Sequence, residues 1–189
     1  MLVATEIDPE MLAACRAGDR DAFRDLFEMY KDMVYSVALR YAGDPAAAMD
    51  ISQDVFVKLF FQLPNFRGES GFETWLYRMI VNRCLDQRRK FSRIVPLLAD
   101  AIHRFSVNER VTADLIRQET RAEIRTAIAS LPDELRIAVV LRYTENLSYD
   151  EMAEAMNCAK GTVASRLNRA HKQLAKRLKR LKSKEMSDV

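Results

Sequence analysis

Glycine and proline are scarce in this chain, and their scarcity argues against several fold classes. Five of each occur among 189 residues, whereas all-β sandwiches and barrels need frequent turn residues. Cys15, Cys84 and Cys158 lie too far apart for a zinc cluster or a disulfide framework. No apolar stretch approaches the roughly 20 residues of a membrane-spanning helix. Because 49% of the residues are apolar, a mostly helical protein with a buried core remains.

Residue patterns for catalysis and cofactor binding are also missing. His103 and His171 are the two histidines, and neither has a nucleophile or a carboxylate pair set around it. No glycine-rich phosphate loop and no metal-ligand spacing occurs. We therefore expect no enzymatic activity, no catalytic residue, no cofactor and no metal. The first residues lack the basic flank and apolar run of a secretory signal, which predicts a cytoplasmic protein.

Apolar residues recur at three- and four-residue steps, which predicts a series of helices. The predicted helices cover residues 22–41, 45–62, 72–90, 114–130 and 133–144. The period is lost in between, around Pro96. The prediction is an all-α fold of two small helical domains, residues 1–92 and 114–189, joined by a flexible linker over 93–113. Only Arg136 and Arg142 interrupt the apolar run of the 133–144 helix, so we expect that helix at the centre of its domain.

Positive charge is concentrated in two places, although the net charge is only +3. Ten Lys or Arg residues and no acidic residue occur between Lys160 and Lys184. A second basic cluster lies between Arg83 and Arg93. One such run also suits a solvated helix end, but two separated basic faces favour contact with a polyanion at two places.

The segment from Leu147 to Leu174 has the pattern of a helix-turn-helix. Ser148 and Glu151 form a capping box that begins a short helix, and Asn157 tolerates the left-handed backbone of a tight turn. A second helix then begins near Lys160. Its outward Arg and Asn side chains suit base edges in the major groove, and its Lys and Ser side chains suit phosphates. The candidate DNA contacts are Lys160, Thr162, Ser165, Arg166, Asn168, Arg169 and Lys172.

A second candidate segment runs from Asn65 to Lys90 and mixes aromatic with basic and amide side chains. Bases of single-stranded nucleic acid stack on aromatic rings while cations neutralise the phosphates. Core packing is the alternative for each aromatic, and Phe72 and Trp75 fit the core better. The interleaved residues are Phe66, Phe72, Trp75 and Tyr77 with Arg67, Arg78, Asn82 and Arg83.

Three motifs follow one another in a fixed order: DISQDVFVKLF, then FRGESGFETWLYRMIVNRCLDQRRK, then LPDELRIAVVLRYTENLSYDEMAEAMNCAKGTVASRLNRAHKQL. In this order the chain resembles bacterial sigma factors of the extracytoplasmic-function (ECF) group over residues 20 to 180. The resemblance implies a protein that binds core RNA polymerase, recognises the −35 and −10 promoter elements and promotes transcription initiation.

The resemblance also implies a role for each motif. The shared face of Asp50, Gln53, Asp54 and Lys58 would bind the clamp helices of the largest polymerase subunit. A loop over residues 65–71 would capture a flipped −10 base, and the helix after it would separate the strands. The −35 element would be read by the helix-turn-helix, which would also lie against the flap of the second-largest subunit. The implied −10 contacts are Asn65, Phe66, Arg67, Ser70, Phe72, Arg78, Asn82 and Arg83.

The sequence departs from the family pattern at two positions of the helix-turn-helix. Ala159 and Ala164 stand where the family often has a proline and a basic residue, so the detailed −35 preference stays open. The family also implies an anti-sigma factor, often a membrane-anchored one.

Two other functions fit parts of the sequence. A dimeric helix-turn-helix regulator acting without core polymerase is one alternative to a sigma factor, and a helical adaptor without a DNA role is the other. The acid-free stretch after Lys160 speaks against the adaptor.

Overall fold

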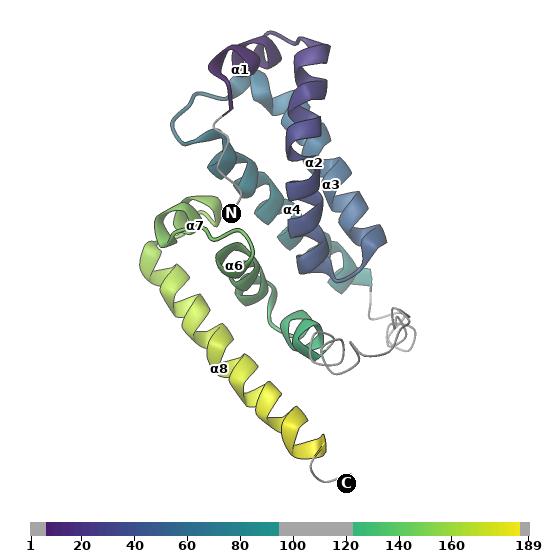
Figure 1. The fold of residues 1–189 in the computed structure, drawn as a ribbon, viewed down its shortest axis with the longest axis vertical. Coiled ribbons are helices and arrows are strands. Elements are labelled where there is room, and N and C mark those ends of the chain that lie inside the picture. Colours follow the sequence, from purple (N-terminus) through teal and green to yellow (C-terminus); the bar gives the residue numbers. More distant parts are fainter. Residues whose placement is uncertain (1–6, 95–122, 186–189) are drawn as a thin grey trace, which may run out of the picture.

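The computed structural model describes residues 7–94 and 123–185, and the regular elements within these ranges are all helices (Figure 1). The predicted all-α fold is therefore confirmed. Apart from its first two residues, the predicted linker lies outside the described residues. The elements are α1 (Pro9–Arg16), α2 (Arg20–Ala42), α3 (Pro45–Gln62), the 3-10 turn η1 (Leu63–Asn65), α4 (Phe72–Ile94), a short helix over residues 123–129, α6 (Asp133–Tyr143), α7 (Tyr149–Ala155) and α8 (Lys160–Glu185).

Local sequence signals explain where the long helices begin and end. Gly43 ends α2 in the left-handed conformation, with φ of 73°, which a residue without a Cβ adopts at no steric cost. Asp44 then caps α3, because its side chain accepts a hydrogen bond of 2.8 Å from the amide of Ala47. Pro45 is the first residue of that helix, where its missing N–H is not needed. The predicted and observed bounds of α3 coincide.

Residues 114–122 of the predicted 114–130 helix lie outside the described residues, and among the described helices two differ most from the prediction. The first is α1, which the apolar pattern did not reveal because it is only 8 residues long, too short for the apolar spacing to repeat. Its start is nevertheless encoded, since Asp8 accepts a hydrogen bond from the amide of Glu10. The second is α4, which continues to Ile94 and so extends four residues past its predicted end at Lys90.

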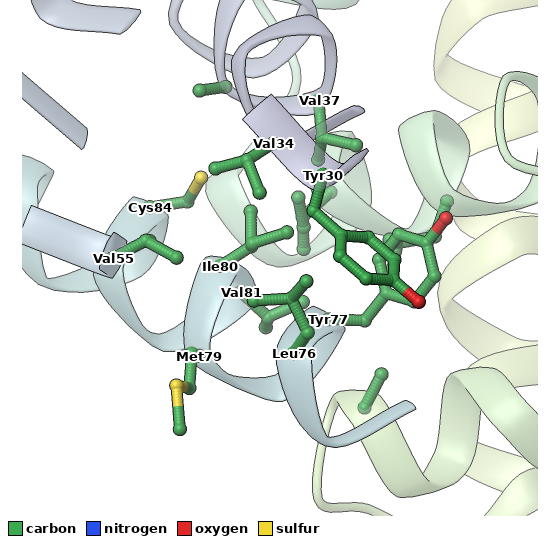
Figure 2. Packing of buried hydrophobic residues seen from close by; sticks show 14 of the residues in the cluster. Tyr30, Val34, Val37, Val55, Leu76, Tyr77, Met79, Ile80, Val81 and Cys84 are labelled. Carbon is green, nitrogen blue, oxygen red and sulfur yellow. The ribbon is translucent and has the colours of Figure 1, made fainter. Parts of the chain in front are cut away.

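In the N-terminal domain α2, α3 and α4 form a three-helix layer, and α1 packs against α2 (Figure 1). The centre of the layer is fully buried and consists of aliphatic side chains from all three helices, shown in part in Figure 2. The regular three- and four-residue spacing along each helix places these side chains on one face. They include Leu26, Val34, Val37, Ile51, Leu59, Leu76 and Ile80.

The C-terminal domain contains the predicted helix-turn-helix. Ser148 and Glu151 form the expected capping box at the start of α7. Asn157 has φ of 47°, which makes the tight turn between α7 and α8. Behind them lies α6, whose residues from Leu135 to Leu141 are all buried. The predicted burial of α6 is confirmed, but the helix lies between the other C-terminal helices and the N-terminal helices rather than at the centre of its own domain.

The two helical units are not separated in space. A single cluster of buried apolar residues contains side chains of α2, α3 and α4 together with side chains of α6, α7 and α8. The contacts are made by α2 against α6 and by α4 against both α6 and α7. The C-terminal helices therefore pack directly on the N-terminal layer (Figure 1).

The N-cap of α3 gives a first prediction. We expect Asp44→Ala to lower the free energy of unfolding by about 1 kcal/mol, because one amide at the start of the helix loses its acceptor. Urea denaturation followed by circular dichroism measures this loss. Asp32→Ala is the matched control, since Asp32 is exposed inside α2 and alanine has the higher helix propensity. Equal losses in the two variants would contradict the capping role.

Candidate nucleic-acid interface

The outer face of α8 is exposed and polar. Val163, Leu167 and Ala170 are buried against the rest of the domain, so the residues between them must point outward. Of the predicted −35 contacts, five are exposed and Thr162 is half-buried. The exposed five are Lys160, Ser165, Asn168, Arg169 and Lys172.

Arg166 differs from the other predicted −35 contacts. Its side chain is only 14% exposed and forms a 2.6 Å ion pair with Glu134 of α6. The same guanidinium donates a hydrogen bond of 3.3 Å to the Cys158 sulfur, in the turn before α8. Arg166 therefore connects α8 to α6 and to the turn, and these two contacts fix the position of its guanidinium. Lys160 also has a partner, Asp150 at 2.8 Å, but both of these side chains are largely exposed, so that pair is weak.

The loop between η1 and α4 has polar side chains outside and aromatic rings inside. Asn65 and Arg67 are exposed and Ser70 is half-buried. Phe66 and Phe72 are only 6% and 5% exposed, so these two predicted −10 contacts present almost no surface to a base. The centroids of these two rings lie 5.9 Å apart, and the centroid of Phe66 lies 4.8 Å from that of the half-buried Trp75. This aromatic cluster holds the loop in place.

A part-buried hydrogen bond joins α2 to the start of α4 beneath this loop. The Tyr30 hydroxyl of α2 donates to the Glu73 carboxylate over 3.5 Å. Burial, together with the nearby carboxylate, raises the pKa of Tyr30 to about 12, and burial also raises the pKa of Glu73. Tyr30 therefore stays protonated and remains a donor over the physiological pH range.

The basic residues predicted along α4 have partners inside the protein. Arg83 forms an ion pair with Asp54 of α3, which joins a predicted −10 contact to a predicted polymerase contact. Arg78 donates a hydrogen bond of 3.1 Å to the main-chain oxygen of Glu154, in the last turn of α7. Asn82 is exposed. Of the three α4 side chains predicted to hold the −10 strand, Asn82 is thus the one on the open surface.

The outer face of α3 combines the predicted polar residues with apolar ones that the sequence analysis did not single out. Asp50, Gln53 and Lys58 are exposed, as predicted, and so is Asp54. Met49, Val57 and Phe61 are also exposed, and Phe61 is 71% exposed. For Val57 and Phe61 the signal is in the run VFVKLFF, which contains more apolar residues than one helix face can bury. We call Met49, Val57 and Phe61 the apolar stripe of α3.

Comparison with known proteins assigns the chain to a family. Sigma-70 region 2 matches residues 26–94, and Sigma-70 region 4 matches residues 121–174. RNA polymerase sigma-H factor of Pseudomonas aeruginosa is 32% identical, and the match covers 95% of this chain and 98% of that protein. The chain belongs to the ECF sigma factors. As a member of this family it is an alternative sigma factor that promotes transcription initiation, which decides against the dimeric regulator and the adaptor.

Two further relatives have the same extent as this sigma factor. ECF RNA polymerase sigma factor SigW of Bacillus subtilis is 32% identical, covering 88% of this chain and 94% of that protein. ECF RNA polymerase sigma-E factor of Escherichia coli K12 is 34% identical, covering 88% and 92%. Both matches cover nearly the whole length of the relative, so the similarity is not confined to the helix-turn-helix.

Solved structures share the fold. The sigma factor RpoE, in complex with the anti-sigma factor NepR from Bartonella quintana, has a TM-score of 0.65 and 25% identity, covering 83% of this chain and 96% of that one. CnrH, in complex with the cytosolic domain of CnrY, has a TM-score of 0.66 at 22% identity, covering 90% and 96%. In this sigma factor, none of the helices within the described ranges is long and apolar enough to cross a membrane.

The cysteines of the sigma factor give a second prediction. Cys84 is buried, and burial raises the pKa of its thiol to about 12, whereas Cys158 is half-buried in the helix-turn-helix. Because thiolate is the reactive form, we expect iodoacetamide at pH 8 to modify Cys158 roughly tenfold or more faster than Cys84. Peptide mass spectrometry measures both rates, and urea should make them similar. Equal rates in the folded protein would contradict the packing of α4.

Proposed function

We propose that this sigma factor directs core RNA polymerase to promoters through three surfaces. The outer face of α3 binds the polymerase, the loop before α4 captures the −10 strand, and the outer face of α8 reads the −35 element. The observation that carries the proposal is the exposure of these faces over buried apolar backing. Each recognition surface is thus placed on a rigid element, as a binding site requires.

The α3 face is suited to a helical protein partner with basic groups at its rim. The apolar stripe offers exposed anchors, and large exposed apolar residues near one another mark protein-binding surfaces. Asp50 and Gln53 lie beside the stripe on the same helix and are exposed. We assign this face to the clamp helices of the largest polymerase subunit, with the stripe supplying most of the affinity and the Asp50 carboxylate fixing the orientation.

On α8, the exposed residues divide by chemistry. Arg169 suits the paired acceptors of guanine, and Asn168 suits the donor and acceptor of adenine. Lys160, Ser165 and Lys172 suit phosphate oxygens, which position the helix without reading sequence. Arg166 is already paired with Glu134 and Cys158, so we assign it the role of positioning α8 in the groove. The C-terminal domain also binds the flap of the second-largest subunit in this proposal.

At the −10 element, the loop captures a base that has already left the stack. Asn65, Arg67 and Ser70 supply hydrogen bonds and charge, and Phe66 and Phe72 keep the loop rigid from below. Melting about ten base pairs costs roughly 1.4 kcal/mol for each stacked step, whereas a captured base returns about 1–3 kcal/mol. The sigma factor therefore traps the open strand, and the polymerase supplies the remaining binding surface.

An anti-sigma factor is part of the proposal. RpoE and CnrH were both solved with a second protein bound, which for RpoE is the anti-sigma factor NepR and for CnrH is the cytosolic domain of CnrY. We propose that this chain also binds an anti-sigma factor, and that the anti-sigma factor is one that can be anchored in the membrane. Because core polymerase and promoter DNA are cytoplasmic, we place the sigma factor in the cytoplasm.

The first test is transcription by core polymerase. Added sigma factor should direct core enzyme to start RNA at one position of its promoter, whereas the isolated sigma factor should bind that promoter poorly. Phe61→Glu should weaken core binding about tenfold or more, because an exposed aromatic anchor that the polymerase would cover is replaced by a charge. Met29→Glu is the matched control, since Met29 is an exposed apolar residue of α2. Unchanged transcription after adding the wild-type protein would refute the proposed function.

The second test separates base reading from phosphate contact on α8. Arg169→Ala should lose about 1–3 kcal/mol of discrimination between the correct and a substituted −35 base pair. Lys172→Ala should weaken binding equally for both sequences and reduce its salt dependence. Competition binding of the polymerase holoenzyme to the two promoters measures both effects. A uniform loss in Arg169→Ala would assign Arg169 to the backbone instead.

A further inference from the structure

Positive charge continues along α8 beyond the residues assigned to the −35 element. The helix extends from Lys160 to Glu185, which is about 39 Å at 1.5 Å per residue. Leu174 still packs on the small buried cluster of the C-terminal domain, whereas the end of α8 extends past the other described helices (Figure 1). Six Lys or Arg residues and no acidic residue lie between Lys176 and Lys184. The proposed −35 contacts therefore use only the first half of a helix whose second half is rich in cations.

Three of the cations lie in one row on the outer face of α8. Arg169, Lys172 and Lys176 follow one another at steps of three and four residues, so they share a face, and all three are exposed. Within the described ranges, none of the three forms an ion pair. We call these three residues the cation row of α8. Arg177 is also exposed but lies roughly 100° further around the helix axis, outside the row.

The cation row is unfavourable for the helix on its own. Like charges three or four positions apart on a helix repel each other. Attraction to the negative end of the helix dipole falls off within the last turn, and Lys176 lies more than two turns before the end of α8 at Glu185. Neither an acidic partner within the described ranges nor the helix end therefore accounts for the row. A polyanion that covers the row would relieve the repulsion.

The place of the row on α8 favours duplex DNA as that polyanion. The N-terminal residues of a recognition helix contact the base edges, in a major groove about 12 Å wide. Lys176 lies about 24 Å along the helix axis from Lys160. Because the groove curves around the duplex, a straight helix leaves it within a few turns, and its later side chains pass over the sugar–phosphate backbone. Arg169 can therefore stay at the bases while Lys176 meets phosphates outside them.

We propose that the cation row extends the DNA contact of α8 past the −35 element, with Lys176 binding backbone phosphates that border the element. The inference rests on the proposed function, because it takes the reading of the −35 bases by α8 as given. A phosphate contact carries no sequence information of its own. It adds affinity that is equal for all promoters and depends on salt, since each neutralised phosphate releases counterions. Base reading and backbone binding thus belong to successive parts of one helix.

Two neighbouring alanine variants test this assignment, because each removes one exposed cation and alanine suits a helix. Lys176→Ala should weaken promoter binding of the polymerase holoenzyme roughly fivefold at about 0.1 M salt and reduce its salt slope by about one. The loss should be equal for promoters with the correct and with a substituted −35 element. Arg177→Ala is the matched control, with a loss of less than about twofold and an unchanged slope. Competition binding at several salt concentrations measures these values.

Neutral backbone linkages identify the partner of the row. Methylphosphonates in place of the phosphates that border the −35 element should weaken the wild type more than Lys176→Ala, since the variant has already lost a contact. Equal losses in the two alanine variants would overturn the inference, and so would a Lys176→Ala loss confined to binding of core polymerase, which would assign the row to an acidic protein surface. A wild-type holoenzyme that binds the correct and the substituted promoter equally would instead refute the proposed −35 reading, and the extended contact with it.

Discussion

The burial of α6 is the constraint on which the packing of the two domains depends. A helix that is apolar on most sides must be covered on most sides. Leu135 and Val139 pack with Ala170 of α8, whereas Ile137 and Leu141 belong to the large cluster shared with α2, α3 and α4. The C-terminal domain covers only part of this helix, and the N-terminal layer covers the rest. The hydrophobic effect therefore favours contact between the domains.

Charge then decides how the covered surfaces meet. The interface places Arg136 and Arg78 on helix-end carbonyls and leaves Glu145 with two donors. Such groups add little net stability when correctly paired but are costly when one partner is removed. The apolar surface thus supplies the attraction between the domains, and the polar pairs determine a single register in which α4 contacts α7.

Local features of the sequence predicted most of the fold. Ser148 and Asn157 act through their own backbone neighbours, so their roles were visible in the sequence. The partners of Arg78, Arg83 and Arg166 were not, because they lie 76, 29 and 32 positions away along the chain. The periodicity also predicted which helix faces are buried. It did not show that Phe66 would join Phe72 in the core, since Phe66 precedes α4 in a loop without a repeating pattern.

The apolar stripe of α3 has a consequence for the life of the free protein in the cell. Phe61 and its neighbours remain in water whenever no partner covers them, and exposed apolar surface invites self-association and capture by chaperones. Synthesis in excess of available partners would lead to aggregates or proteolysis. The apolar residues that suit α3 to its partner therefore limit the amount of active protein to the amount of partner that can cover them.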